Sequence, residues 1–167
     1  MEWADLVGYV EPASVIVGGI WAYWRFVFQR DRYPRVTLTP RIEQVARHNG
    51  ERVVRVSVDV RNDGTVRLII PEMWYTLRTL RYGDRILDGG PNLLGQPVFP
   101  NLEVHRRPFT HPRHVYAFVD AGTTATFTSV ARLAPSTHLA LVQVNMRYRD
   151  PDSEFHGAIA VVQLPVK

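Results

Sequence analysis

Three histidines that lie close together are the residues of this 167-residue chain best suited to chemistry. His105, His111 and His114 fall within the ten-residue segment HRRPFTHPRH. Neutral imidazoles bind zinc and copper, and a nearby carboxylate, Glu103 or Asp120, could complete a metal site. One interpretation of the segment is therefore a metal-dependent enzyme.

The surroundings of these histidines favour a different interpretation. Pro112 interrupts the His-x-x-His spacing, and neither a helical nor a strand pattern fixes its geometry. The arginines within the segment disfavour a bound cation. We therefore expect no metal and a basic docking loop that binds an acidic partner or anionic lipid headgroups. The residues of this expected docking loop are His105, Arg106, Arg107, His111, Arg113 and His114.

Other catalytic signatures are missing from the sequence. There is no Gly-x-Ser-x-Gly elbow, and Gly89-Gly90-Pro91 lacks the helix and lysine of a phosphate loop. The chain contains no cysteine, which excludes a disulfide framework and a cysteine nucleophile. We expect a protein that is not an enzyme, with no catalytic residues and no cofactor.

The charge is basic but dispersed. Twenty Lys and Arg against sixteen Asp and Glu give a formal net charge of +4, and Lys167 is the only lysine. The arginines occupy outward strand positions and turns, and no nucleic-acid reader motif occurs. We expect acidic protein or lipid partners and no nucleic acid.

Residues 12–28 are predicted to form a transmembrane helix after a short acidic segment, 1–11. Arg25 is the only charged residue in this stretch, whose seventeen residues give about 25 Å of helix against a bilayer core of about 30 Å. The apolar residues 6–10 can supply the missing length, and aromatic residues gather at the C-terminal end. A buried helix of a soluble domain and a cleaved signal peptide are the alternatives.

Basic residues follow the helix and predict its orientation. Arg25, Arg30, Arg32 and Arg35 lie on its C-terminal side, whereas the N-terminal side is acidic. The positive-inside rule then places the N-terminus outside and the rest of the chain in the cytoplasm. We expect a single-pass protein of the bacterial inner membrane.

The predicted helix carries a stripe suited to packing. Ser14, Gly18 and Ala22 are spaced four apart and share one face, and Arg25 projects within the same stripe. Small residues at this spacing allow a second helix to approach closely in lipid. The aromatic residues beside the stripe either face lipid or contact a neighbour or pigment; they are Trp21, Trp24 and Phe28.

After a polar hinge at 29–34, residues 35–167 are predicted to form one β-sandwich. The clearest strand is 52–61, in which Val54, Val56, Val58 and Val60 alternate with polar residues. Asn-Gly and Asn-Asp-Gly turns flank it. The other predicted strands are 35–45, 65–70, 73–81, 101–106, 114–120, 123–133, 138–148 and 154–164, with a bulge near Leu141-Val142 and a loop at 88–100. This series of short strands is typical of an immunoglobulin-like antiparallel sandwich.

The segments GGIWAYWRF, YPRVTL and VSVDVRNDGTV resemble uncharacterised bacterial single-pass membrane proteins with an N-terminal anchor and an immunoglobulin-like domain. This resemblance implies a binding or scaffolding role and identifies no catalytic residue. We therefore expect a non-catalytic accessory subunit of a multi-subunit membrane complex. Its helix would anchor it, and its β-domain would clamp the complex. The aromatic helix suits a pigment-rich neighbour, so a photosynthetic reaction centre or antenna is preferred to a respiratory complex. A free-standing membrane-tethered binding module is the alternative.

Overall fold

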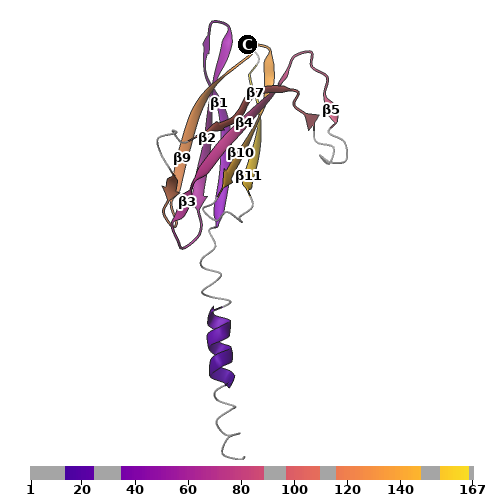
Figure 1. Ribbon diagram of the computed structural model, residues 1–167. Coiled ribbons are helices and arrows are strands. Elements are labelled where there is room, and N and C mark those ends of the chain that lie inside the picture. Colours follow the sequence, from indigo (N-terminus) through magenta and orange to yellow (C-terminus); the bar gives the residue numbers. More distant parts are fainter. Residues whose placement is uncertain (1–13, 25–34, 89–96, 110–115, 148–154, 166–167) are drawn as a thin grey trace, which may run out of the picture.

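The computed structural model describes residues 14–24, 35–88, 97–109, 116–147 and 155–165 (Figure 1). Within these residues one helix, 14–24, precedes a series of strands. The strands are β1 (Val36–His48), β2 (Glu51–Asn62), β3 (Leu68–Ile70), β4 (Glu72–Arg81), β5 (Leu87–Asp88), β6 (Pro97–Val98), β7 (Asn101–Pro108), β8 (Ala117–Val119), β9 (Thr124–Leu133), β10 (Thr137–Arg147) and β11 (His156–Gln163).

Two antiparallel sheets form the body of the protein. One has the strand order β1-β2-β9 and the other β11-β10-β4-β7. The short pairs β3-β8 and β5-β6 lie beside them (Figure 1). The predicted all-β antiparallel fold is confirmed, and the two sheets pack as a sandwich around a shared core.

The core is built from the inward residues of the central strands. Val54, Val56, Val58 and Val60 of β2 are 0% exposed, as the alternation in the sequence predicted. They pack with a second apolar row on β4, in which Tyr75 is the largest fully buried side chain. Alternate residues of a strand point to opposite faces, so the intervening residues of β2 are left on the outside.

The first strand is longer than predicted and lies at a sheet edge. It extends to His48 and pairs only with β2 within the described chain. The register shifts between Gln44 and Ala46, so Val45 bulges out of the ladder and is exposed. An edge position tolerates Pro40, which cannot donate a ladder hydrogen bond.

The bulge predicted at Leu141-Val142 is in the wrong place. The inward row of β10 runs without interruption through Ala140, Val142 and Val144, and the register with β4 shifts between Thr137 and Leu139 instead. Leu141 therefore faces outward, where it is only half-buried. The apolar residues on both faces of β10 suggested a slip at Leu141-Val142, where the strand is regular.

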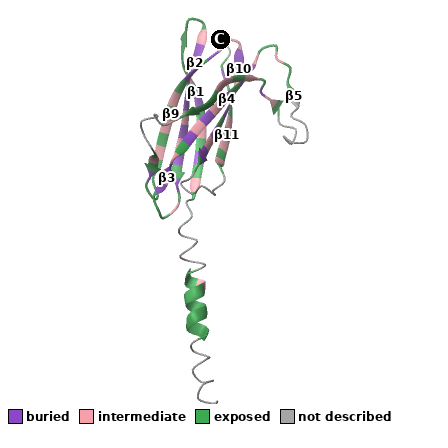
Figure 2. Ribbon diagram, viewed as in Figure 1, coloured by how far each residue is buried: buried purple, intermediate pink, exposed green. Residues whose placement is uncertain are grey.

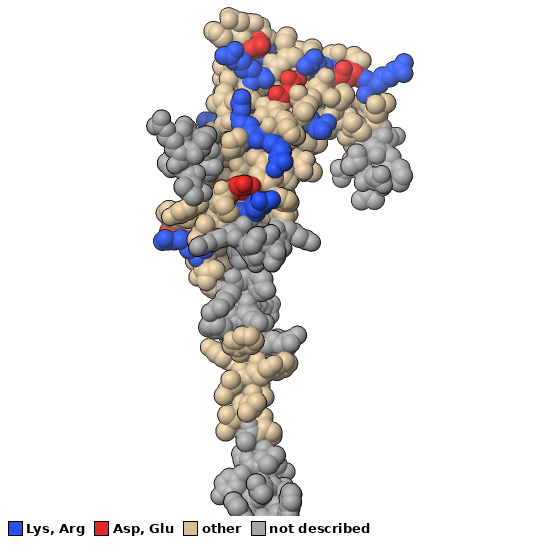
Figure 3. Space-filling view, in the orientation of Figure 1, with Lys and Arg blue, Asp and Glu red and all other residues tan. Residues whose placement is uncertain are grey.

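The N-terminal helix exposes its apolar surface. All its large apolar side chains are between 53% and 73% exposed, and Figure 2 shows the helix as almost entirely exposed. It carries no charged residue, as Figure 3 also shows. Within the described ranges no helix is both long and apolar enough to cross a membrane. The predicted span 12–28 extends beyond the described helix at both ends, and the predicted segments 1–11 and 29–34 lie outside the described residues.

Candidate interaction surface

The predicted docking loop is in part an edge strand. His105, Arg106 and Arg107 are exposed residues of β7, which pairs only with β4 within the described chain. The predicted strand 101–106 already includes His105 and Arg106, and β7 extends it to Pro108. The strand therefore ends later than predicted and includes Arg107, because the alternation that marks a strand is lost where a bulge inserts a residue. The remaining loop residues, His111, Arg113 and His114, lie outside the described residues.

The bulge in β7 directs its two arginines to opposite sides of the sheet. Tyr75 pairs with Arg107 but Leu77 pairs with Val104, so β7 has one residue more than β4 over this stretch. Arg106 takes up the excess with a φ of 44°, in the left-handed region. Its guanidinium stacks on the ring of Trp74, 4.7 Å from the centroid.

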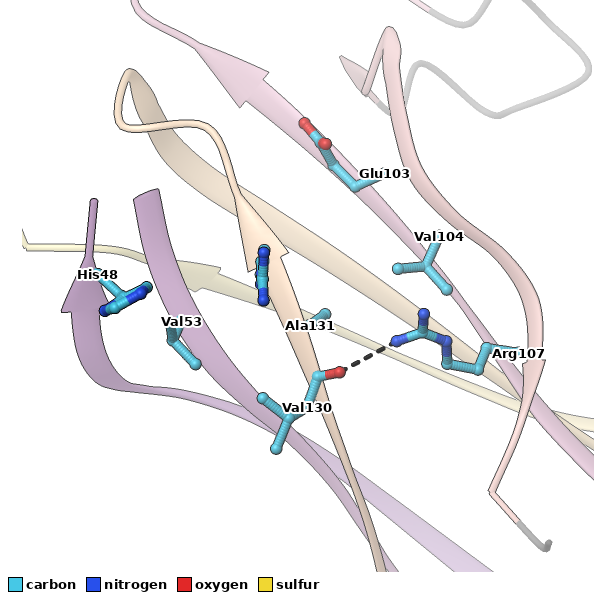
Figure 4. Close-up of a pocket in the computed structure, with 8 residues that line it drawn as sticks. His48, Val53, Glu103, Val104, Arg107, Val130 and Ala131 are labelled. Atoms are coloured by element: carbon cyan, nitrogen blue, oxygen red, sulfur yellow. Dashed lines mark hydrogen bonds between the residues drawn. The ribbon is translucent and has the colours of Figure 1, made fainter. Parts of the chain in front are cut away.

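Arg107 reaches in the other direction, toward the edge of the opposite sheet. Its Nη1 donates a hydrogen bond of 3.0 Å to the backbone oxygen of Val130 on β9 (Figure 4). Between the two edges lies a cleft of about 530 Å³, which Figure 4 shows. The residues lining this cleft are His48, Val53, Glu103, Val104, Arg107, Val130, Ala131 and Arg132.

The single carboxylate in the cleft has a structural role. Oε1 of Glu103 accepts hydrogen bonds from Thr79 Oγ1 at 2.8 Å and from Arg81 Nη2 at 2.9 Å. This network joins β7 to β4 beneath the cleft and engages the carboxylate of Glu103. Within the described part of the chain, no group of three His, Asp or Glu residues is placed to hold a metal ion.

The outer face of the four-stranded sheet is unusually apolar. Ile159 and Val161 of β11 are 56% and 54% exposed, and Leu141, the cross-strand neighbour of Val161, is half-buried. Leu102 on β7 and Phe155, just before β11, are also about half exposed. Exposed apolar residues thus occur near both edges of this sheet, on β7 and on β11.

Arginines and aromatic rings are layered over one end of the same face. The rings of Trp74 and Phe155 meet edge to face, with centroids 5.3 Å apart. Arg106 covers Trp74, and Arg147 covers Phe155 at 4.8 Å. Cation–π stacking of this kind holds a guanidinium in place while its N–H groups stay available to a partner.

The outer face of the three-stranded sheet has the opposite character. Its arginines are matched by carboxylates: Arg41 pairs with Asp59 at 3.0 Å and Arg55 with Glu43 at 2.6 Å. Thr126 Oγ1 on β9 also donates to Asp59, at 2.7 Å. The cross-strand partners on this face are mostly Thr, Ser, Arg, Asp and Glu. It is therefore a self-neutralised polar surface of the kind that faces water.

The helical packing residues are only partly within the described chain. Ser14 and Gly18 are exposed and Ala22 is half-buried, and a side chain added at Gly18 would meet nothing within 4 Å. The neighbouring aromatics Trp21 and Trp24 are exposed. The other residues assigned to this surface, Arg25 and Phe28, lie outside the described residues.

The outer face of the four-stranded sheet was not predicted as a site, although the sequence contains a signal for it. The strand HGAIAVVQ is apolar at successive positions, with Ala158 and Ala160 inward and Ile159 and Val161 outward. A strand that is apolar on both faces is typical of a sheet covered on both sides. This pattern distinguishes β11 from β2, whose outward residues are polar.

The sequence matches no protein-family model and none of the curated proteins compared with it. Among solved structures, the fold is similar to one from Bordetella pertussis described as ApaA, with a TM-score of 0.50 and 12% identity over 80% of this chain and 97% of that one. A protein from Archaeoglobus fulgidus gives a TM-score of 0.37 at 11% identity, covering 78% of this chain and 100% of that one. A Bacteroides uniformis β-glucuronidase gives 0.42 at 13% identity, over 77% of this chain and 13% of the enzyme. At 12% identity the Bordetella structure shows a similar fold and carries no information about activity.

Proposed function

We propose that this chain is a membrane-anchored, non-catalytic accessory subunit of a bacterial membrane complex. Its N-terminal segment lies in the bilayer, and its β-domain holds a partner chain on the cytoplasmic side. The three-plus-four arrangement of the main strands supports an immunoglobulin-like class for this domain. The proposal depends chiefly on one observation, the exposure of every large apolar side chain of the helix.

The exposed apolar surface of the helix is costly in water. Burying a Val, Ile or aromatic side chain is worth about 1.5–3 kcal/mol, and the helix presents seven such residues. The β-domain already has a complete core of its own, so it needs none of them. Lipid, with a second helix against the small-residue stripe, supplies the missing environment.

Membrane fractionation tests the anchor. We expect the full chain to stay in membranes washed with alkaline carbonate and to be released only by detergent, because its helix is inserted. Replacing Ile16 by Asp should shift the chain to the soluble fraction, whereas Ser57→Asp on the polar face of β2 should not. Release of the unaltered chain by carbonate would contradict the proposal.

Substitutions at two neighbouring glycines, Gly18 and Gly19, test whether the chain is a subunit of a complex. A Cβ added at Gly18 or at Gly19 would meet no atom within 4 Å, but only Gly18 lies on the stripe with Ser14 and Ala22. We expect Gly18→Leu to separate the chain from its complex during detergent extraction and sizing, with the β-domain still folded, and Gly19→Leu to leave the complex intact. A wild-type chain that migrates alone would instead indicate a free-standing tethered module.

The proposed orientation has its own test. Protease added outside intact cells should leave the β-domain uncut, and protease added to inverted membrane vesicles should release it. Trimming from the outside would reverse the proposed topology.

A further inference from the structure

We infer that the outer face of the four-stranded sheet binds an acidic protein surface that also carries apolar residues. The inference rests on the proposed function, because it specifies where the β-domain holds its partner. The face is formed by the outward residues of β11, β10, β4 and β7, together with Phe155. Its aliphatic residues include Leu141, Ile159 and Val161, and its arginines are Arg78, Arg106 and Arg147.

Exposed or half-buried aliphatic residues occur on three of the four strands of this face. Val161 pairs with Leu141, which pairs with Arg78, which pairs with Leu102. Three of these four cross-strand neighbours are aliphatic, and Ile159 lies in the adjacent row. Exposed aliphatic residues grouped in this way on a sheet surface are typical of an interaction site.

Charge on the same face determines the chemistry of the partner. Among the described residues, the outward charged groups of this face are Arg78, Arg106, Arg147 and Glu72, which gives three cations and one carboxylate. That carboxylate, Glu72, is 3.7 Å from Arg147. The other two arginines contact uncharged groups, since Arg78 donates to the backbone oxygen of Phe99 and Arg106 stacks on the ring of Trp74. A partner with Asp or Glu side chains complements this excess of positive charge.

The arginines are arranged for recognition before a partner arrives. Stacking on Trp74 and Phe155 fixes the guanidinium groups of Arg106 and Arg147, which lowers the entropy lost when they pair with a carboxylate. Aromatic residues and arginine are also the residues enriched at the energetically important centres of protein interfaces. The corresponding face of the other sheet differs, since its Arg41 and Arg55 are already paired with carboxylates.

A protein partner fits this face better than a lipid surface does. Ile159 and Val161 have short β-branched side chains that stand on a sheet with half-buried neighbours. Membrane-surface binding instead relies on amphipathic helices that insert an apolar face among the acyl chains. A sheet of this kind packs best against a second protein surface, and carboxylates of that surface would meet the planar guanidinium groups.

Site-specific photocrosslinking in the native membrane tests the inference on the full-length chain. The photoreactive residue p-benzoylphenylalanine is placed at Ile159 on the four-stranded face, or at Thr128 on the three-stranded face as a matched control. We expect the first position to yield one protein adduct, with the cross-linked peptide rich in Asp or Glu, and the second to yield none. A lipid adduct, an adduct with a second copy of this chain, or equal yields at both positions would overturn the inference.

Charge variants then test the acidic nature of the partner. In the chain that carries the crosslinker at Ile159, Arg78→Gln and Arg106→Gln together should lower the adduct yield about tenfold, because each removes a charge that pairs across the interface. The matched change Arg55→Gln on the opposite face should leave the yield unchanged. An undiminished yield from the double variant would contradict an acidic partner.

Membrane retention and adduct formation, measured on the same membranes, distinguish failure of this inference from failure of the proposed function. If both fail, the chain is lost from the carbonate-washed membranes and no adduct forms. If only the inference fails, the chain remains in the membrane and in its complex while Ile159 gives no protein adduct. Circular dichroism of each purified variant confirms that the β-domain is still folded.

Discussion

The N-terminal helix and strand β2 are both rich in apolar residues, but their side chains have opposite environments. Valines of β2 are 0% exposed at the four inward positions 54, 56, 58 and 60, whereas Val15 and Val17 of the helix are 73% and 67% exposed. The strand alternates apolar and polar residues, and its apolar row packs against the opposite sheet. The helix is apolar on nearly all sides, and its large side chains remain open.

This difference shows which apolar side chains are buried within the chain itself and which are left exposed. Burial that the chain provides for itself stabilises the fold, and its loss should lower the free energy of unfolding. Apolar surface that the chain leaves open contributes nothing to that free energy and requires another occupant. The same substitution made at a buried and at an exposed position therefore distinguishes apolar residues that stabilise the fold from those that do not. The measurements use the full chain in mild detergent.

The largest difference is expected when aspartate replaces one buried valine of β2 and, in a second variant, one exposed valine of the helix. Val56→Asp buries an unpaired carboxylate in the core and should cost about 4 kcal/mol or more, enough to unfold many domains of this size. Val17→Asp should leave unfolding of the β-domain unchanged, because its side chain is already exposed. Denaturant unfolding followed by circular dichroism measures both. Equal losses would mean that the helix is part of the folded β-domain.

A smaller effect is expected where β2 itself contains a buried charge. Arg52 lies on the inward row and is 3% exposed, with Nη1 donating to Pro165 O at 2.9 Å and Gln44 Oε1 at 3.2 Å, and Nε donating to Pro135 O at 3.1 Å. Arg52→Ala should cost about 3 kcal/mol, because three part-buried acceptors lose their donor and a cavity remains where the buried side chain was. Denaturant unfolding of the full chain gives this loss.

The exposed neighbour of Arg52 serves as the control. Arg55 forms a surface ion pair with Glu43, and pairs of this kind contribute about 0–1 kcal/mol, so Arg55→Ala should change the denaturation midpoint little. An equal loss in the two variants would show that the three acceptors around Arg52 do not stabilise this end of the sandwich.

The sequence predicted those parts of the fold in which local pattern and burial agree. Strand 52–61 was predicted correctly because each second residue is a valine and Asn-Gly turns flank the segment. The strands 123–133 and 138–148 were likewise close to β9 and β10. The period of two determined both the element and its inward face in 52–61, whereas in 138–148 it determined the element only.

The register irregularities and the interaction surface could not be predicted in the same way. Arg106 occupies the left-handed region in a bulge, and its stacking on Trp74 joins two strands that are far apart in the sequence. Such contacts depend on which strands become neighbours, and alternation along one strand carries no information about that. The sequence predicts Arg106 and Arg107 as neighbours in one docking loop, whereas in the structure their side chains reach in opposite directions from β7.

The smallest effect is expected for an isosteric change on the two sides of the sandwich. Val58→Thr buries a hydroxyl in the core and should cost about 1–3 kcal/mol, whereas Val161→Thr on the outer face of β11 should change stability by about 0.5 kcal/mol or less. Thermal unfolding of the two variants in parallel gives the comparison. If Val161→Thr were as destabilising as Val58→Thr, Val161 would contribute to the fold, and its exposure would no longer require a partner. If it is neutral, Val161 resembles the helix valines: it is apolar surface that the β-domain does not need for folding, on the same face as the stacked arginines.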